Sequence, residues 1–210
     1  PGARQKSPGS KYYYGASFIM GFAAMFTKEH AATLPLTILL YDFFFLREER
    51  GIHWKQALPF LLLLSIVPLT VWITKPVVVS DIHRLLHDPL GAGVSYACTQ
   101  LKVLVTYVRL FLLPVNQNLD YDYPVSHSFL EIPVLASALV LVLIIIAGIR
   151  AFPRHRLISF GIFWFFLTLI PESSIIPLLD IIYEHRMYLP LVGCSIAGVG
   201  IICHVFRNMK

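Results

Sequence analysis

The chain has 210 residues, of which 57% are hydrophobic and 14% are charged, and its formal net charge at pH 7 is +5. A mean hydropathy of +0.70 excludes an ordinary soluble domain of this length and predicts a polytopic membrane protein. The basic residues lie in short clusters between apolar runs and match no nucleic-acid-binding pattern, so we expect no nucleic-acid partner.

Apolar runs long enough to lie in a membrane recur along the chain. A helix needs roughly 20 apolar residues to cross a hydrocarbon core of about 30 Å. The runs do not alternate polar and apolar residues, which argues against a β-barrel. We therefore predict an all-α fold with about six transmembrane helices. The predicted spans are residues 12–27, 30–46, 56–74, 132–149, 157–170 and 187–206.

Basic clusters set the expected orientation of these spans. The clusters are residues 4–11, 47–55, 150–156 and 207–210. The positive-inside rule places all of them on the cytoplasmic side, so both ends of this chain are expected there. The stretches 75–131 and 171–186 then face outward. We also expect the chain to be an internal fragment of a longer protein, since it begins at Pro1 without an initiator Met.

Within the first outward stretch, residues 94–113 carry a polar stripe on an otherwise apolar helix. Its members, spaced by four, three, four and three residues, are Ser95, Thr99, Lys102, Thr106 and Arg109. Such a helix is typical of an interfacial or re-entrant segment rather than a full span. Lys102 and Arg109 either extend toward lipid headgroups or present two cations to one anionic group.

Lys28 and Glu29 separate two apolar runs at the expected outward boundary. A helical hairpin turn would explain these charges by itself. The alternative is a cavity site in which Lys28 binds an anion and Glu29 orients it.

Residues 118–124 follow the striped helix, and Asp120 and Asp122 alternate there with Tyr121 and Tyr123. Two carboxylates at this spacing can hold a divalent cation, and the tyrosines suit stacking against a sugar. A plain interfacial loop explains the same residues, because Tyr is enriched at membrane boundaries. We therefore treat these four residues as acceptor or metal candidates, and a divalent cation stays open as a cofactor.

Residues 171–190 hold the densest group of ionisable side chains near an expected span. They are Glu172, Asp180, Glu184, His185 and Arg186. Ionisable groups at a bilayer boundary are costly to desolvate, so they mark either a solvated loop or a site. Arg186 can bind phosphate in bidentate geometry, His185 can donate to a phosphate oxygen, and Glu184 can pair with Arg186 or act as a base. A salt-bridged helix end is the structural alternative.

These motifs occur in a characteristic order: Lys28-Glu29-His30 with Leu34-Pro35, then residues 118–124, 171–174 and 184–190. Together they resemble the membrane region of the transmembrane-and-tetratricopeptide-repeat family, which has bacterial members and animal O-mannosyltransferases. The resemblance covers nearly the whole chain. It implies a GT-C glycosyltransferase fold in a membrane such as the bacterial inner membrane, with tetratricopeptide repeats after the membrane part. It further implies a polyprenyl-phosphate sugar donor, a protein or glycan acceptor and transfer on the outward face.

For an enzyme of this type, we expect the donor phosphate to lie near Arg186 and His185, with Lys28, Lys102 or Arg109 assisting. The resemblance places the catalytic base upstream of Pro1. The candidates for a base within this chain are Glu29, Glu172 and Glu184. We expect Lys28, Asp120, Glu172 and Arg186 to converge on one outward cavity, since charges at a boundary are cheaper when they share water or a counter-charge.

Two other function classes compete with the enzyme. A transporter or flippase for an anionic lipid or sugar would need a polar path at mid-membrane and usually inverted repeats. The ionisable residues instead collect at the expected outer boundary, and no repeat is evident. The second competing class is a non-catalytic membrane anchor for tetratricopeptide repeats. Only an acidic loop motif upstream of Pro1, present in the enzyme and missing from the anchor, would separate the two.

Overall fold

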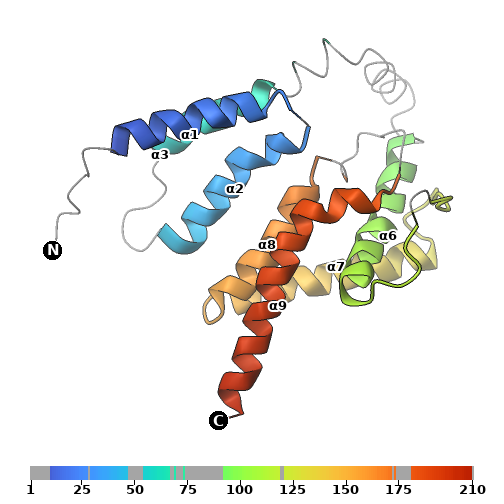
Figure 1. The fold of residues 1–210 in the computed structure, drawn as a ribbon. Coiled ribbons are helices and arrows are strands. Elements are labelled where there is room, and N and C mark those ends of the chain that lie inside the picture. The colour runs from blue at the N-terminus through green and yellow to red at the C-terminus, as the bar shows by residue number, and fades with distance from the viewer. Residues whose placement is uncertain are drawn as a thin grey trace. The chain divides into compact units, whose positions relative to one another are not determined.

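The computed structural model describes residues 10–27, 29–46, 54–66, 69, 73, 92–118, 121–171, 173 and 181–209. Within these ranges each regular element is a helix and none is a strand, which confirms the all-α class. The chain divides into two compact units, residues 1–74 and 75–210, and each is described by itself. Figure 1 labels the helices of both units.

The first unit consists of short helices around a small apolar core. They are α1 (Ser10–Ala24), the 3₁₀ helix η1 (Glu29–Thr33), α2 (Leu34–Tyr41), the π-helix η2 (Asp42–Leu46), α3 (Trp54–Leu62) and the 3₁₀ helix η3 (Leu63–Ser65). Its buried core contains Met25, Phe60 and Leu63. The Phe60 ring also meets the rings of Tyr14 and Phe18 edge-on, a geometry that aromatic pairs prefer.

The second unit holds the longer helices. They are α6 (Ala92–Leu112), α7 (Ile132–Ala151), α8 (Arg156–Leu169), the 3₁₀ helix η4 (Glu184–Met187) and α9 (Tyr188–Asn208). Pro133 lies in the first turn of α7, where its missing N–H removes no helical hydrogen bond. Side chains from α6, α8 and η4 share one core. Its buried members are Val103, Tyr107, Leu110, Phe165, Leu169, Ile182 and Met187.

Helices α8 and α9 lie side by side (Figure 1) and approach most closely at two glycines. A Cβ atom added to Gly161 would lie 2.3 Å from the carbonyl oxygen of Gly193, and one added to Gly193 would lie 2.5 Å from that of Gly161. No side chain larger than hydrogen fits between these backbones. Small residues allow the same close approach between helices in membranes.

Two helices of the second unit are long and apolar enough to cross a membrane. They are Ile132–Ala151 and Glu184–Arg207, and only 17% of the most apolar window of each is buried within the protein. A core helix of a soluble protein would be mostly buried, so this exposure supports membrane association. The apolar helices His30–Leu46 and Arg156–Leu169 are shorter, and α6 does not qualify despite its 21 residues. The count of six spans is therefore not confirmed.

Candidate functional site

The polar stripe of α6 holds the segment that follows this helix, which we call the strap (the described residues 113–118 and 121–131). Every member of the stripe makes a hydrogen bond to the strap. In order along α6, the bonded pairs are Ser95 with His127 (3.2 Å), Thr99 with the Ser126 N–H (2.9 Å), Lys102 with the Pro124 carbonyl (2.8 Å), Thr106 with the Tyr123 hydroxyl (3.1 Å) and Arg109 with the Val115 carbonyl (3.0 Å). The strap therefore runs back along α6, antiparallel to it.

Both cations of the stripe take part in this binding. Lys102 and Arg109 each donate to a backbone carbonyl of the strap, and the Lys102 ammonium lies 5.4 Å from the centroid of the Tyr123 ring. The sequence alternatives for these cations were headgroup contact and anion binding. Neither alternative foresaw that a later segment of the chain folds back along the helix. Helical periodicity shows that one face is polar but does not show what binds to that face.

A second pair of α6 residues holds residues 181–183, just before η4. The buried Gln100 amide donates to the Ile181 carbonyl over 2.9 Å. The hydroxyl of Tyr107, which is 1% exposed, donates to the Tyr183 carbonyl (3.0 Å) and accepts from the Tyr183 N–H (3.2 Å). One buried hydroxyl thus satisfies both backbone groups of Tyr183. The sequence did not single out this pair. Tyr107 in particular looks like one more apolar position of α6, and nothing in the local pattern shows that its hydroxyl has a distant partner.

The strap and η4 meet directly at the Glu184 carboxylate. Its Oε1 atom accepts hydrogen bonds from the Asn118 N–H (2.7 Å) and from the Tyr121 hydroxyl. Partial burial, together with the bond to Glu184, raises the pKa of Tyr121, so its hydroxyl stays protonated and donates. Residues more than 60 positions apart in sequence are therefore joined at the start of α9.

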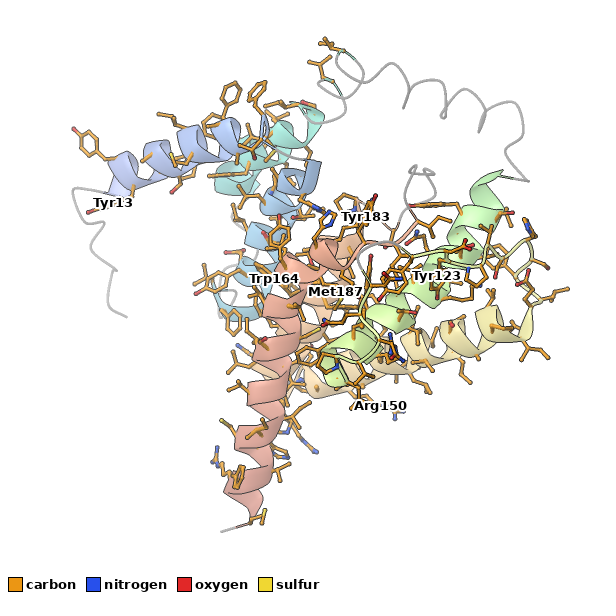
Figure 2. The ribbon with its side chains drawn as sticks, turned by 45° about the vertical axis from the view of Figure 1, so that its right-hand side comes forward. Tyr13, Tyr123, Arg150, Trp164, Tyr183 and Met187 are labelled. Carbon is orange, nitrogen blue, oxygen red and sulfur yellow. The ribbon has the colours of Figure 1, made fainter. Side chains whose placement is uncertain are left out.

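Helix η4 carries a half-buried cation, Arg186, and an exposed imidazole, His185. The His185 ring stacks on Tyr183 with centroids 4.9 Å apart, and the Arg186 guanidinium carbon lies 5.2 Å from the Tyr183 ring centroid. Beside them is a depression of about 220 Å³, lined by Gln117, Asn118, Glu184 and His185. Figure 2 labels Tyr123 on the strap and Tyr183 before η4. The imidazole and amide groups that line this depression, together with the Arg186 guanidinium one residue further along η4, can bind an oxyanion.

Several predicted site residues cannot be placed. Lys28, Asp120 and Glu172 lie outside the described residues, as does the side chain of Glu29, so their convergence with Arg186 stays a prediction. Glu184 is the one catalytic candidate of the sequence analysis whose side chain is described. Glu184 binds the strap, whereas the sequence had suggested that it pairs with Arg186 or acts as a base.

The acceptor and metal candidates have different surroundings. Tyr121 contacts Glu184 and Tyr123 contacts Thr106, whereas Asp122 is exposed. No group of three His, Cys, Asp or Glu side chains that could hold a metal ion occurs among the described residues. A divalent cation at Asp122 and Asp120 is therefore still a prediction.

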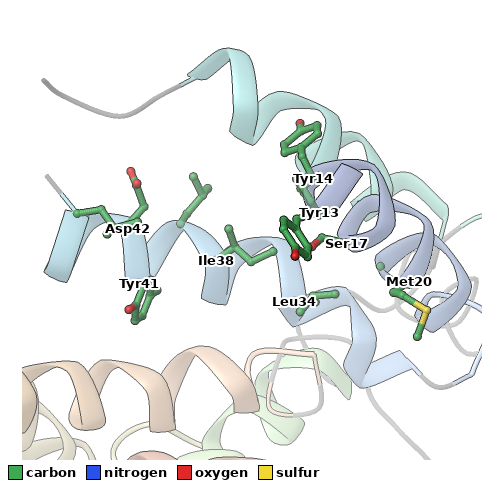
Figure 3. A pocket seen from close by; sticks show the side chains of 12 residues that line it. Tyr13, Tyr14, Ser17, Met20, Leu34, Ile38, Tyr41 and Asp42 are labelled. Atoms are coloured by element: carbon green, nitrogen blue, oxygen red, sulfur yellow. The ribbon is translucent and has the colours of Figure 1, made fainter. Parts of the chain in front are cut away.

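A larger cavity of about 630 Å³ lies within the first unit, between α1 and α2 (Figure 3). Tyr13, Tyr14 and Ser17 line it from α1, and Leu34 and Ile38 line it from α2. Asp42 is the one charged side chain among the described residues around it. A bound phosphate would need a cation, and none occurs among the described residues that line this cavity, so we place the candidate site in the second unit despite its smaller volume.

Comparison with known proteins adds no assignment. No protein-family model, curated protein or solved structure matches the chain. The functional interpretation therefore depends on the geometry of the strap and η4 and on the order of the sequence motifs.

Proposed function

We propose that this chain is part of an integral-membrane glycosyltransferase of the GT-C type, which transfers a sugar from a polyprenyl-phosphate donor to a protein or glycan acceptor. The observation that carries the proposal is the meeting of the strap and η4 at the start of α9, a helix long enough to cross a membrane. A lipid-linked phosphate lies at such a boundary, where the hydrocarbon core ends. The order of the sequence motifs supports the same function.

In this proposal the residues of η4 bind the donor. Arg186 holds the phosphate through its planar pair of donors, and His185 supplies a further donor. These groups stabilise the negative charge that develops on the lipid phosphate as it leaves. Lys102 and Arg109 act through the strap that they hold, and the proposal assigns no catalytic base to the described residues.

The topology of the full membrane region belongs to the same proposal. About six spans in a GT-C arrangement would put residues 75–131 and 171–186 on the outward face and the chain ends in the cytoplasm. The strap and η4 then face the same side, as their contacts require. A bacterial inner membrane is the host membrane that the resemblance suggests.

Substitution of Arg186 tests the donor site. Arg186→Lys keeps the charge but loses the two-donor fork, and a charge-assisted contact contributes about 1.5–3 kcal/mol, so transfer should fall roughly tenfold or more. Arg186→Ala should be worse, because it removes the charge as well. The measurement is sugar transfer from a polyprenyl-phosphate donor by the full-length parent protein, normalised to its abundance in the membrane.

Arg207→Lys, at the far end of α9, is the matched control and should leave transfer unchanged. Wild-type transfer by Arg186→Ala at normal abundance would remove Arg186 from the donor site. A parent protein that transfers no sugar in its unmodified form would instead favour the non-catalytic membrane anchor.

A further inference from the structure

The end of the second unit opposite η4 gathers arginines from two separate segments. Arg150 lies in the last turn of α7, Arg154 lies in the connection to α8, and Arg156 begins α8; all three are exposed. Arg207, in the last turn of α9, is exposed too. Figure 2 labels Arg150 at this end of the unit.

Ring contact fixes the end of α9 against the α7–α8 connection. The rings of His155 and His204 have centroids 4.1 Å apart. One turn earlier, a Cβ atom at Gly200 would lie 2.9 Å from the Cγ1 atom of Ile158, so the two helices are in close contact there. Arg207 follows His204 by one helical turn and so lies on the same face of α9, and His204 contacts His155, the residue next to Arg154. We call Arg150, Arg154, Arg156 and Arg207 the basic surface.

The chain near the basic surface supplies apolar side chains but no acidic ones. Neither residues 132–171 nor residues 185–210 contain an Asp or Glu. Leu157 is 55% exposed and Phe206 is 65% exposed, and both lie within three residues of an arginine of the surface. Cations bordered by exposed apolar side chains match the boundary between headgroups and acyl chains.

We propose that the basic surface binds the headgroup of an anionic phospholipid, whose acyl chains lie along the exposed apolar side chains beside it. Arginine matches the phosphate of such a lipid through paired donors, and the two segments offer donors from two sides. Basic residues between helix ends attract anionic headgroups in the same way in other membrane proteins. This surface is independent of the glycosyltransferase proposal, because it lies at the opposite end of α9 from η4.

Native mass spectrometry of the full chain in detergent tests this surface. The probes are dioleoyl-phosphatidylglycerol, which is anionic, and dioleoyl-phosphatidylcholine, which has the same acyl chains and no net charge. The unmodified chain should retain phosphatidylglycerol preferentially. Each basic residue near a charged headgroup contributes about fivefold in affinity, so the triple variant Arg150→Gln/Arg154→Gln/Arg207→Gln should bind phosphatidylglycerol about 100-fold more weakly. The matched triple variant with lysine at these positions should keep most of the preference.

Two further arms separate the possible outcomes. Arg207→Gln alone should weaken binding about fivefold, and no change would show that the α7–α8 connection binds without α9. Inorganic phosphate, compared with chloride at equal ionic strength, should not displace the lipid. Displacement by phosphate, or equal retention of the two lipids by the unmodified chain, would overturn a lipid-headgroup site. Because the substituted positions are exposed, each variant should keep the helical circular dichroism signal of the unmodified chain. If a variant loses that signal, the single variant Arg154→Gln is tested in its place.

Discussion

Replacing Gly161 with alanine is expected to destabilise the α8–α9 pair more than any other single-methyl addition among the described glycines. The added Cβ atom would lie 2.3 Å from the Gly193 carbonyl oxygen, 2.7 Å from the Ala197 nitrogen and 2.9 Å from the Ala197 Cβ. Two of these neighbours are backbone atoms, so the helices must move apart. Overpacking of this kind costs about 1–3 kcal/mol, which thermal unfolding in detergent, followed by circular dichroism, would measure.

Gly198→Ala, on α9 but away from its contact with α8, is the matched control. Its added Cβ atom would meet only the Phe111 ring, at 3.8 Å, which is an ordinary contact. Both substitutions gain about 1 kcal/mol of helix propensity in a helix interior, so their difference isolates the clash. If Gly161→Ala unfolded at the same midpoint temperature as Gly198→Ala, then α8 and α9 would not approach each other at Gly161 as described.

Tyr107→Phe is expected to have the second large effect. The ring stays in the buried core, but the Tyr183 N–H and carbonyl both lose their hydrogen bond to the Tyr107 hydroxyl. A hydrogen bond contributes about 0.5–1.5 kcal/mol, so the loss of two should lower the free energy of unfolding by about 2 kcal/mol. Amide hydrogen exchange should speed up at residues 182–187, because η4 loses its anchor to α6.

Tyr123→Phe is the comparison for this variant. It removes one hydroxyl bond, to Thr106, from a half-buried strap residue, so the loss should stay below about 1 kcal/mol. Exchange at residues 182–187 should not change in that variant. Unchanged exchange there in Tyr107→Phe would mean that Tyr107 does not hold the segment before η4.

The composition of the chain was enough to predict an all-helical fold, but it did not predict which helices contact each other. Long apolar runs fix α7 and α9 because hydropathy depends on local sequence alone. The close approach at Gly161 and Gly193 depends on which helix faces which, and one sequence carries no such pairing. The same holds for Tyr107, whose hydroxyl matters only because Tyr183, 76 positions away, lies against it.

The sequence identified the two segments of the candidate site separately but did not predict that they contact each other. Residues 118–124 and 184–186 stood out separately, because tyrosines, carboxylates and a cation near apolar runs are unusual. Their junction through Tyr121 and Glu184 is a tertiary contact, and so is the strap along the stripe of α6. The stripe was correctly recognised as one helical face, but periodicity shows only that a face is polar and not what it binds.

Chemical cross-linking between Asn118 and His185 tests most directly whether the strap and η4 form one site. Both residues line the same depression. The experiment uses the double variant Asn118→Cys/His185→Cys in membranes, with the native cysteines removed and a short thiol cross-linker. The control pair is Asn118→Cys with Phe206→Cys, in which the second position lies 18 residues beyond the start of α9 at Tyr188 and therefore about 27 Å along the helix. The structure predicts rapid cross-linking of the first pair and none of the control pair. The proposed function further predicts slower cross-linking when polyprenyl phosphate is added. Equal cross-linking of the two pairs, or none of either, would contradict a strap joined to η4.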